Sequence, residues 1–183
     1  RTIIQTQVGE AKYLEAGFDT STKRLRPISI PPEVYRITKD IAAGLLNPKN
    51  NDPDLKNAGG RMLLMMQGGY RPSDFKALSI ENIDFETGIV TGLELKTDKG
   101  TKGIGVAYFP RSQLDVVRAV IGDRKSGLVF QNPEVLDKII NENLKSSELP
   151  KIRYLQESTN TIVENPFTAY DFRRMQETAL QAA

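Results

Sequence analysis

The chain has 183 residues, 39% of them apolar, which suffices for one sizeable core and makes a single domain the default expectation. It contains neither cysteine nor histidine. This composition excludes disulfides, thiolate chemistry, histidine-based acid–base catalysis and most zinc sites. The formal net charge is only +2, so total charge gives weak support for a nucleic-acid partner.

Targeting signals are not visible in the sequence. No apolar run reaches the roughly 18 residues of a membrane-spanning helix, and the first residues do not form a signal peptide. Together with the lack of cysteine, this predicts a cytoplasmic protein. The first residue is Arg1 and not methionine, which favours a fragment or a processed chain.

In chain order, residues 1–26 are polar and show little periodicity, so we expect a linker or the tail of a preceding domain. Apolar residues at helical spacing then predict five helices. A proline pair opens the first, Asn132 is the expected N-cap of the fourth, and the last follows a polar stretch, 146–167, that we expect to be a loop. The expected helices cover residues 31–46, 55–67, 111–121, 132–145 and 169–183.

Short apolar runs separated by turn residues predict strands. Residues 83–85, 89–95 and 105–109 give two or three antiparallel strands, and residues 127–130 a short strand or buried extended piece. The expected fold class is α+β, a mostly helical domain with one small antiparallel sheet.

One arginine stands on a glycine break between two helical segments, in "GGYRPSDF". Gly68 and Gly69 are expected to end one helix, and Pro72 to start the next. Arg71 therefore lies at a rigid turn. It could pair with a nearby acid such as Asp74, or bind an anion.

Other basic residues gather in clusters, and a single such cluster is usually a solvated surface. Lysines at 96, 99 and 102 flank a glycine-rich hairpin turn, and Arg173-Arg174 enter the last expected helix. Two guanidinium groups and an ammonium group suit a phosphodiester, because arginine binds phosphate oxygens bidentately and stabilises added negative charge. A lysine on a turn can also donate a proton to a leaving oxygen. No set of carboxylates with metal-ligand spacing is visible, and we expect neither metal nor cofactor.

Three segments resemble the tyrosine recombinases (phage integrase family). "GGYRPSDFKALSIENIDFETG" is similar to the first arginine box of that family, "KGTKGIGV" to its lysine hairpin, and "TAYDFRRMQETAL" to its second arginine box. Their order is more specific than any one motif, and the similarity covers residues 27–183. The resemblance implies an integrase-like catalytic domain in residues 27–183, with residues 1–26 as the exit from a preceding DNA-binding domain.

The resemblance also implies residue roles. Arg71 and Arg173 would hold the scissile phosphate, Lys99 would protonate the 5′ oxygen, and Tyr170 would assist at the phosphate. Lys96 and Lys102 remain alternatives to Lys99 for the catalytic lysine. With Arg174, they are otherwise expected to bind the DNA backbone.

The sequence departs from the family pattern in two places. Tyr170 replaces the usual histidine of the second box, and a tyrosine hydroxyl is a poor proton acceptor near neutral pH. The segment that carries the nucleophilic tyrosine in the family is not found before Ala183, so we expect a domain incomplete at its C-terminus and inactive alone.

The implied function is site-specific DNA recombination through a 3′-phosphotyrosyl intermediate. Double-stranded DNA and other recombinase protomers, assembled as a tetramer on paired sites, would be the partners. Two alternatives stay open: a non-catalytic DNA-binding relative of the family, and a helical interaction domain in which the basic segments do not converge.

Overall fold

The computed structural model describes residues 25–96, 102–156, 159–169, 171–172 and 175; in 25–29, 94–96 and 102–104 it describes the backbone alone. The chain divides into two compact units. The smaller one lies within Arg1–Ser29 and Ile152–Asn165, and the larger one within Ile30–Lys151 and Pro166–Ala183.

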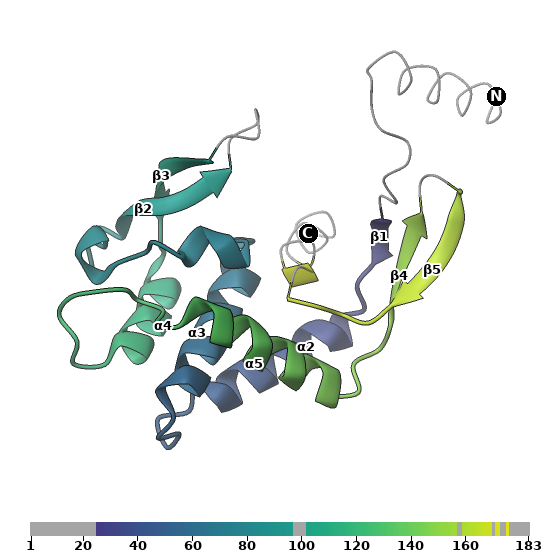
Figure 1. The fold of residues 1–183 in the computed structure, drawn as a ribbon, viewed down its shortest axis with the longest axis horizontal. Coiled ribbons are helices and arrows are strands. Elements are labelled where there is room, and N and C mark those ends of the chain that lie inside the picture. Colours follow the sequence, from purple (N-terminus) through teal and green to yellow (C-terminus); the bar gives the residue numbers. More distant parts are fainter. Residues whose placement is uncertain (1–24, 97–101, 157–158, 170, 173–174, 176–183) are drawn as a thin grey trace, which may run out of the picture. The chain divides into compact units, whose positions relative to one another are not determined.

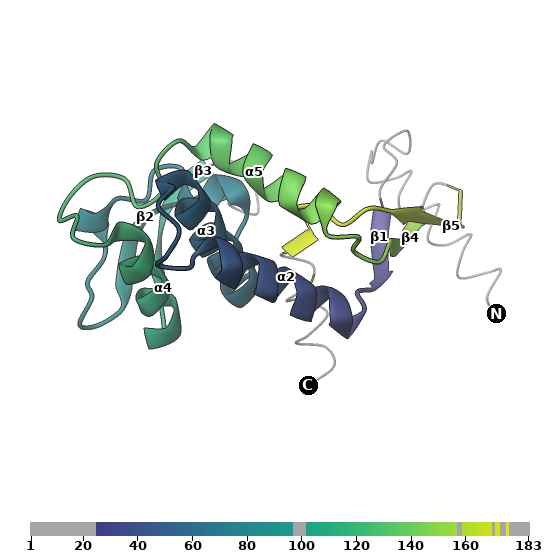
Figure 2. The same cartoon turned by 90° about the horizontal axis from the view of Figure 1, so that it is seen from below.

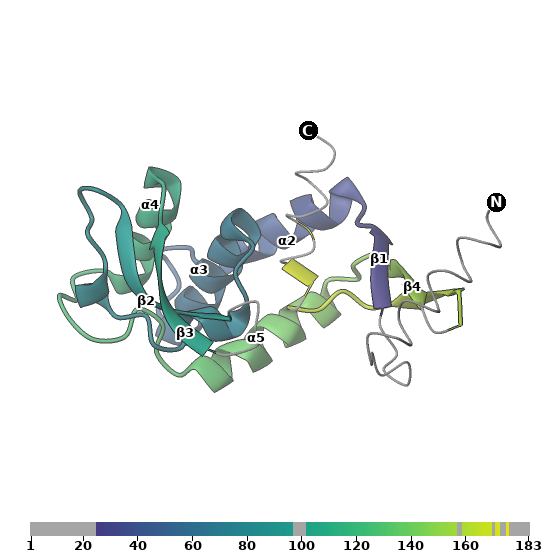
Figure 3. The ribbon, with the colours of Figure 1, turned by 90° about the horizontal axis from the view of Figure 1, so that it is seen from above.

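In its described residues the larger unit contains four α-helices (Figure 1). Each coincides with a predicted helix: α2 (Pro32–Leu45), α3 (Pro53–Gly68), α4 (Arg111–Ile121) and α5 (Pro133–Ser146). Helix α3 contacts the other three and lies between α2 and α5 (Figures 2 and 3). No helix in the described part of the chain is long and apolar enough to cross a membrane.

Two glycines let α3 approach its neighbours closely. A Cβ atom on Gly59 would lie 2.6 Å from the carbonyl oxygen of Ala42 in α2, and one on Gly60 would lie 2.1 Å from a methyl carbon of Val120 in α4. Both distances are far below van der Waals contact, so these positions require glycine. Most of the apolar centre of α3 is buried, with Met62, Leu64 and Met65 at 0% exposure.

A two-stranded antiparallel hairpin completes the larger unit. Strand β2 (Ile89–Lys96) pairs with β3 (Lys102–Tyr108), and Lys96 stands opposite Lys102 in the register. The register shifts between Thr91 and Leu93, where Gly92 has a φ of 87°. The predicted sheet is therefore confirmed, and residues 83–85 join it only through a single bridge from Ile83 to Val90.

The smaller unit holds a second sheet that the sequence pattern did not predict. Strands β1 (Leu25–Ser29), β4 (Ile152–Gln156) and β5 (Thr161–Asn165) pair antiparallel in the order β1-β4-β5. The expectation of a loop over 146–167 was wrong. In β4, Ile152 and Tyr154 are buried while Arg153 between them is exposed, which is the alternation of a half-buried strand.

Candidate functional site

The turn that carries Arg71 is built by two glycines with different tasks. Gly69 ends α3 in the left-handed conformation, with a φ of 65°, and its N–H donates to the carbonyl oxygen of Met65 at 2.9 Å. Gly68 leaves room for the ring of Tyr70, because a Cβ atom there would lie 2.0 Å from that ring. The chain then restarts as a short 3-10 helix, Pro72–Phe75, as the proline signal predicted.

Asp74 fixes the backbone of Arg71. Its carboxylate accepts the Arg71 backbone N–H at 2.8 Å, and the Asp74 N–H donates to the Arg71 carbonyl oxygen at 3.0 Å. Asp74 is buried, so this reciprocal pair is shielded from water. The sequence left open an ion pair between the Arg71 and Asp74 side chains, but the Asp74 carboxylate binds the backbone of Arg71 and not its guanidinium.

The guanidinium of Arg71 has no protein partner among the described residues. No hydrogen bond, ion pair or ring contact within that part of the chain engages it, and the residue is half-buried. A half-buried guanidinium on a fixed backbone is well placed to bind an anion, because the backbone that carries it loses little freedom on binding.

Tyr70 connects this turn to the hairpin. Its ring packs edge-on against Phe75, with 5.3 Å between centroids, and lies 5.7 Å from the ring of Phe109, which follows β3. Burial raises the pKa of the Tyr70 phenol, and the nearby Asp74 carboxylate raises it further. The 3-10 turn also contacts β2 directly. The Arg71 turn therefore lies against the β2–β3 hairpin, and Phe109 marks the end of that hairpin away from the Lys96–Lys102 pair.

Of the three predicted lysines, the structure describes the backbones of Lys96 and Lys102. The backbones of Lys96 and Lys102 are paired as the last and first residues of β2 and β3. Lys99 stands between them in the sequence, outside the described residues. Its role, and the choice among the three lysines, stays a prediction.

The segment of the second arginine box is anchored on both sides of Tyr170. Asp171 accepts hydrogen bonds from the backbone N–H and the hydroxyl of Thr168, at 3.0 and 2.8 Å. Its own N–H returns to the Thr168 carbonyl oxygen at 2.9 Å, which makes a helix-start capping arrangement. Phe172 packs edge-on against Phe167 at 5.2 Å.

The predicted functional side chains of that box are Tyr170, Arg173 and Arg174, and all three lie outside the described residues. The neighbouring residues Ala169, Asp171, Phe172 and Met175 are buried in the larger unit. In addition, the Ala169 N–H donates to the side-chain oxygen of Asn141 in α5 at 3.4 Å. The segment is thus packed into the unit that contains Arg71, while the convergence of Arg71 and Arg173 remains a prediction.

A second arginine, missed by the sequence reasoning, lies next to this site. Arg61 is in the middle of α3 with 1% exposure. Its guanidinium donates to the carbonyl oxygen of Pro72 and, at 3.0 Å, to that of Pro133, and it lies 3.3 Å from a carboxylate oxygen of Asp137. Burial lowers the pKa of Arg61, and the negative charge of Asp137 opposes that change. The signal in the sequence was an arginine in "NAGGRMLLMM", where three of the four residues one helical turn away are apolar, namely Ala58, Leu64 and Met65.

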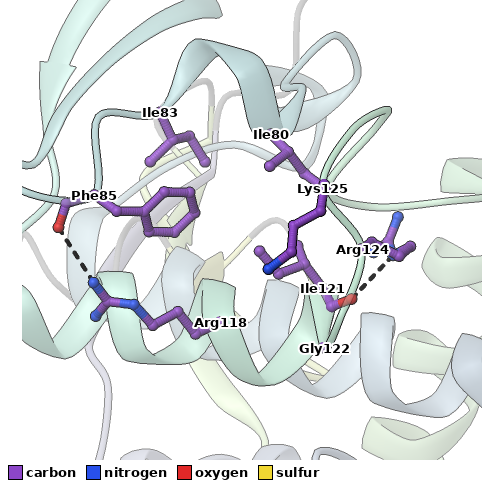
Figure 4. A pocket seen from close by; sticks show the side chains of 8 residues that line it. All are labelled: Ile80, Ile83, Phe85, Arg118, Ile121, Gly122, Arg124 and Lys125. Carbon is purple, nitrogen blue, oxygen red and sulfur yellow. Dashed lines mark hydrogen bonds between the residues drawn. The ribbon is translucent and has the colours of Figure 1, made fainter.

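An open pocket of about 570 Å³ lies between a second short 3-10 helix, Ile80–Asn82, and the end of α4 (Figure 4). It is lined by Ile80, Ile83, Phe85, Arg118, Ile121, Gly122, Arg124 and Lys125. Arg118 is engaged by Asp115, by the Phe85 carbonyl oxygen and by the face of the Phe85 ring at 5.3 Å. Arg124 donates to three backbone carbonyl oxygens, those of Ile121, Leu128 and Val129. None of the predicted site residues lines this pocket.

Comparison of the sequence with protein-family models finds no match, and comparison with curated proteins finds none either. The fold does have a solved counterpart. The structure is similar to the crystal structure of XerA recombinase, with a TM-score of 0.52 and 11% sequence identity. The match covers 86% of this chain and 52% of the recombinase chain, so this chain spans about half the length of that protein. At this identity the likeness concerns the fold, and it agrees with the resemblance seen in the sequence: the chain has a recombinase-like α+β fold.

Proposed function

We propose that this chain is the catalytic domain of a tyrosine-type site-specific recombinase acting on double-stranded DNA. One observation carries the proposal: the Arg71 guanidinium has no protein partner in the described chain, and its turn is anchored on both sides and lies against the β2–β3 hairpin. The recombinase-like fold supports it independently.

In this proposal Arg71 and Arg173 bind the non-bridging oxygens of one phosphodiester. A tyrosine hydroxyl, from a segment that follows the second box in the family, attacks the phosphorus and releases its proton to water. The bond from phosphorus to the 5′ oxygen breaks, and Lys99 gives its proton to that oxygen. The 3′-phosphotyrosyl link retains the phosphoester bond, so rejoining needs no external energy source. Tyr170 hydrogen-bonds a phosphate oxygen, and Lys96, Lys102 and Arg174 bind neighbouring phosphates.

The domain roles follow from the same resemblance. Residues 27–183 form the catalytic domain, and residues 1–26 lead from a preceding DNA-binding domain. Recombination requires further protomers, which we propose assemble as a tetramer on paired DNA sites. Affinity comes mainly from backbone phosphates and falls steeply with salt.

A second candidate function is a DNA-binding relative that cuts no strand. The observation that favours it is Tyr170 in place of histidine, because this substitution removes the family's usual proton acceptor. In that case the arginines bind phosphate, and no covalent intermediate forms.

The decisive experiment uses the longest natural polypeptide that contains this sequence and a duplex nicked next to the cleavage position, which traps the covalent intermediate. We expect a protein–DNA adduct that disappears in Arg71→Ala and in Arg173→Ala. Arg36→Ala is the matched control, because Arg36 is an exposed arginine on α2, with 73% side-chain exposure. Salt-sensitive binding without an adduct would establish the second candidate. An adduct that survives Arg71→Ala would refute the proposed role of this arginine.

A further inference from the structure

Helix α3 buries a guanidinium for which the catalytic proposal has no use. Arg61 is 1% exposed, and its fork joins three segments: α3 itself, the carbonyl oxygen of Pro72 and the start of α5 through Pro133 and Asp137. Desolvating this group is costly, and a buried ion pair is generally no more stabilising than an apolar side chain of similar volume. Stability alone therefore does not explain an arginine here.

The position of its first partner suggests what the arginine does. Pro72 directly follows Arg71, and its ring fixes φ and restricts the residue before it to extended conformations. Arg71 has that conformation, with φ of −83° and ψ of 154°. Once Arg61 holds the Pro72 carbonyl oxygen and Asp74 holds the Arg71 N–H, little freedom remains in the backbone between these two contacts.

We propose that Arg61 is a positioning residue: by holding the Pro72 carbonyl oxygen against α5, it sets where the Arg71 guanidinium meets a DNA phosphate. This inference rests on the proposed function, because it assumes that Arg71 binds phosphate. Asp137 takes part by holding the Arg61 guanidinium from the α5 side, at 3.3 Å.

Salt dependence separates a positioning role from a purely structural one. Each phosphate contact contributes about 0.9 to the slope of log K against log salt concentration. When one contact is lost, the drop in affinity between about 50 and about 200 mM salt becomes about 3.5-fold smaller. A variant that is only less stable binds with a smaller active fraction, which stoichiometric titration measures, and it keeps the slope.

The test measures binding of the 183-residue chain to a short DNA duplex by fluorescence anisotropy over this salt range. Arg61→Lys retains the charge but loses the planar fork that spans two carbonyl groups. We expect its slope to fall toward that of Arg71→Ala. In an Arg71→Ala background, Arg61→Lys should change neither slope nor affinity further, because the contact that it positions is already gone.

Arg124→Lys is the matched control. Arg124 also donates its guanidinium hydrogens to backbone carbonyl groups, but those lie at the end of α4 and in the loop that follows it. Its replacement should leave the slope unchanged and should combine additively with Arg71→Ala. If Arg61→Lys does not fold, Asp137→Ala takes its place, since the Asp137 side chain is 42% exposed and alanine suits a helix.

The outcomes are distinct. An unchanged slope in Arg61→Lys, or in its substitute Asp137→Ala, while Arg71→Ala lowers the slope, overturns the positioning role and leaves the proposed function intact. A slope unchanged in Arg71→Ala itself refutes phosphate binding by Arg71, and the positioning role falls with it.

Discussion

Gly68 is the residue whose replacement tests the geometry of the Arg71 turn most directly. Gly68→Ala adds a Cβ atom 2.0 Å from the ring of Tyr70, so the ring must leave its place between Phe75 and Phe109. Overpacking of this kind costs about 1–3 kcal/mol, whereas replacing a helical glycine by alanine gains about 0.5–1 kcal/mol. We therefore expect a net loss of about 1 kcal/mol in the free energy of unfolding.

The sign should reverse when the ring is absent. In a Tyr70→Ala background the added methyl group meets no ring, so Gly68→Ala should stabilise the chain by about 0.5–1 kcal/mol. The measurement is urea unfolding followed by circular dichroism, for the two single variants and the double variant. Gly44→Ala in α2 is the control: its Cβ would have nothing within 4 Å, so it should stabilise both backgrounds equally. An effect of Gly68→Ala with the same sign and size in both backgrounds would refute the packing argument.

Three further predictions concern the two anchored segments. Gly69→Ala places a side chain at a φ of 65° and should cost about 1 kcal/mol in urea unfolding, while Gly69→Asn should cost less. The raised pKa of Tyr70 means that, above its ordinary value of 10.0, the unfolded chain releases the phenol proton more readily than the folded one. Stability should thus fall as the pH rises through that value, and Tyr70→Phe should show a smaller alkaline loss. Thr168→Ala removes the hydroxyl that donates to Asp171 and should cost about 1 kcal/mol, whereas Thr168→Ser should be close to neutral.

The helices of the larger unit could be predicted because each carries its own signals. Pro32 opens α2, the glycine pair closes α3, and apolar residues recur at helical spacing in between. The bounds of α4 agreed with the prediction at both ends. At α5 the N-cap position was predicted correctly. However, Asn132 has a φ of 50°, and its side chain donates to Asp54 and does not cap the helix.

The second sheet escaped prediction because its pairing is non-local. Strand β1 pairs with β4 across more than a hundred residues, and each strand has only five residues. In β1, Pro27 argues against a strand in general, but β1 lies at the edge of the sheet, where proline is tolerated. The threonines and asparagines around β5 are typical of a loop, and Ile162 is exposed although it is apolar.

The site was predictable to the extent that its residues sit on marked turns. Arg71 stood out because glycine and proline surround it. Asp74 was identified as a partner of Arg71 because the contact spans only three residues, but its carboxylate binds the backbone N–H and not the side chain. The burial of Arg61 depends on tertiary contacts, and its separation of 72 positions from Pro133 leaves no local pattern to find.

Helix α5 is linked to the segments of both arginine boxes, through two side chains that are one helical turn apart. Asp137 pairs with the guanidinium of Arg61, which in turn binds the carbonyl oxygen of Pro72. Asn141 lies four residues later on the same face, and its side-chain oxygen accepts the N–H of Ala169. An α-helix rises about 1.5 Å per residue and stretches little, so these two attachment points keep a nearly constant separation of about 6 Å along its axis. A shift of α5 would carry both segments with it, and the spacing between the two boxes would survive motions that alter the rest of the domain.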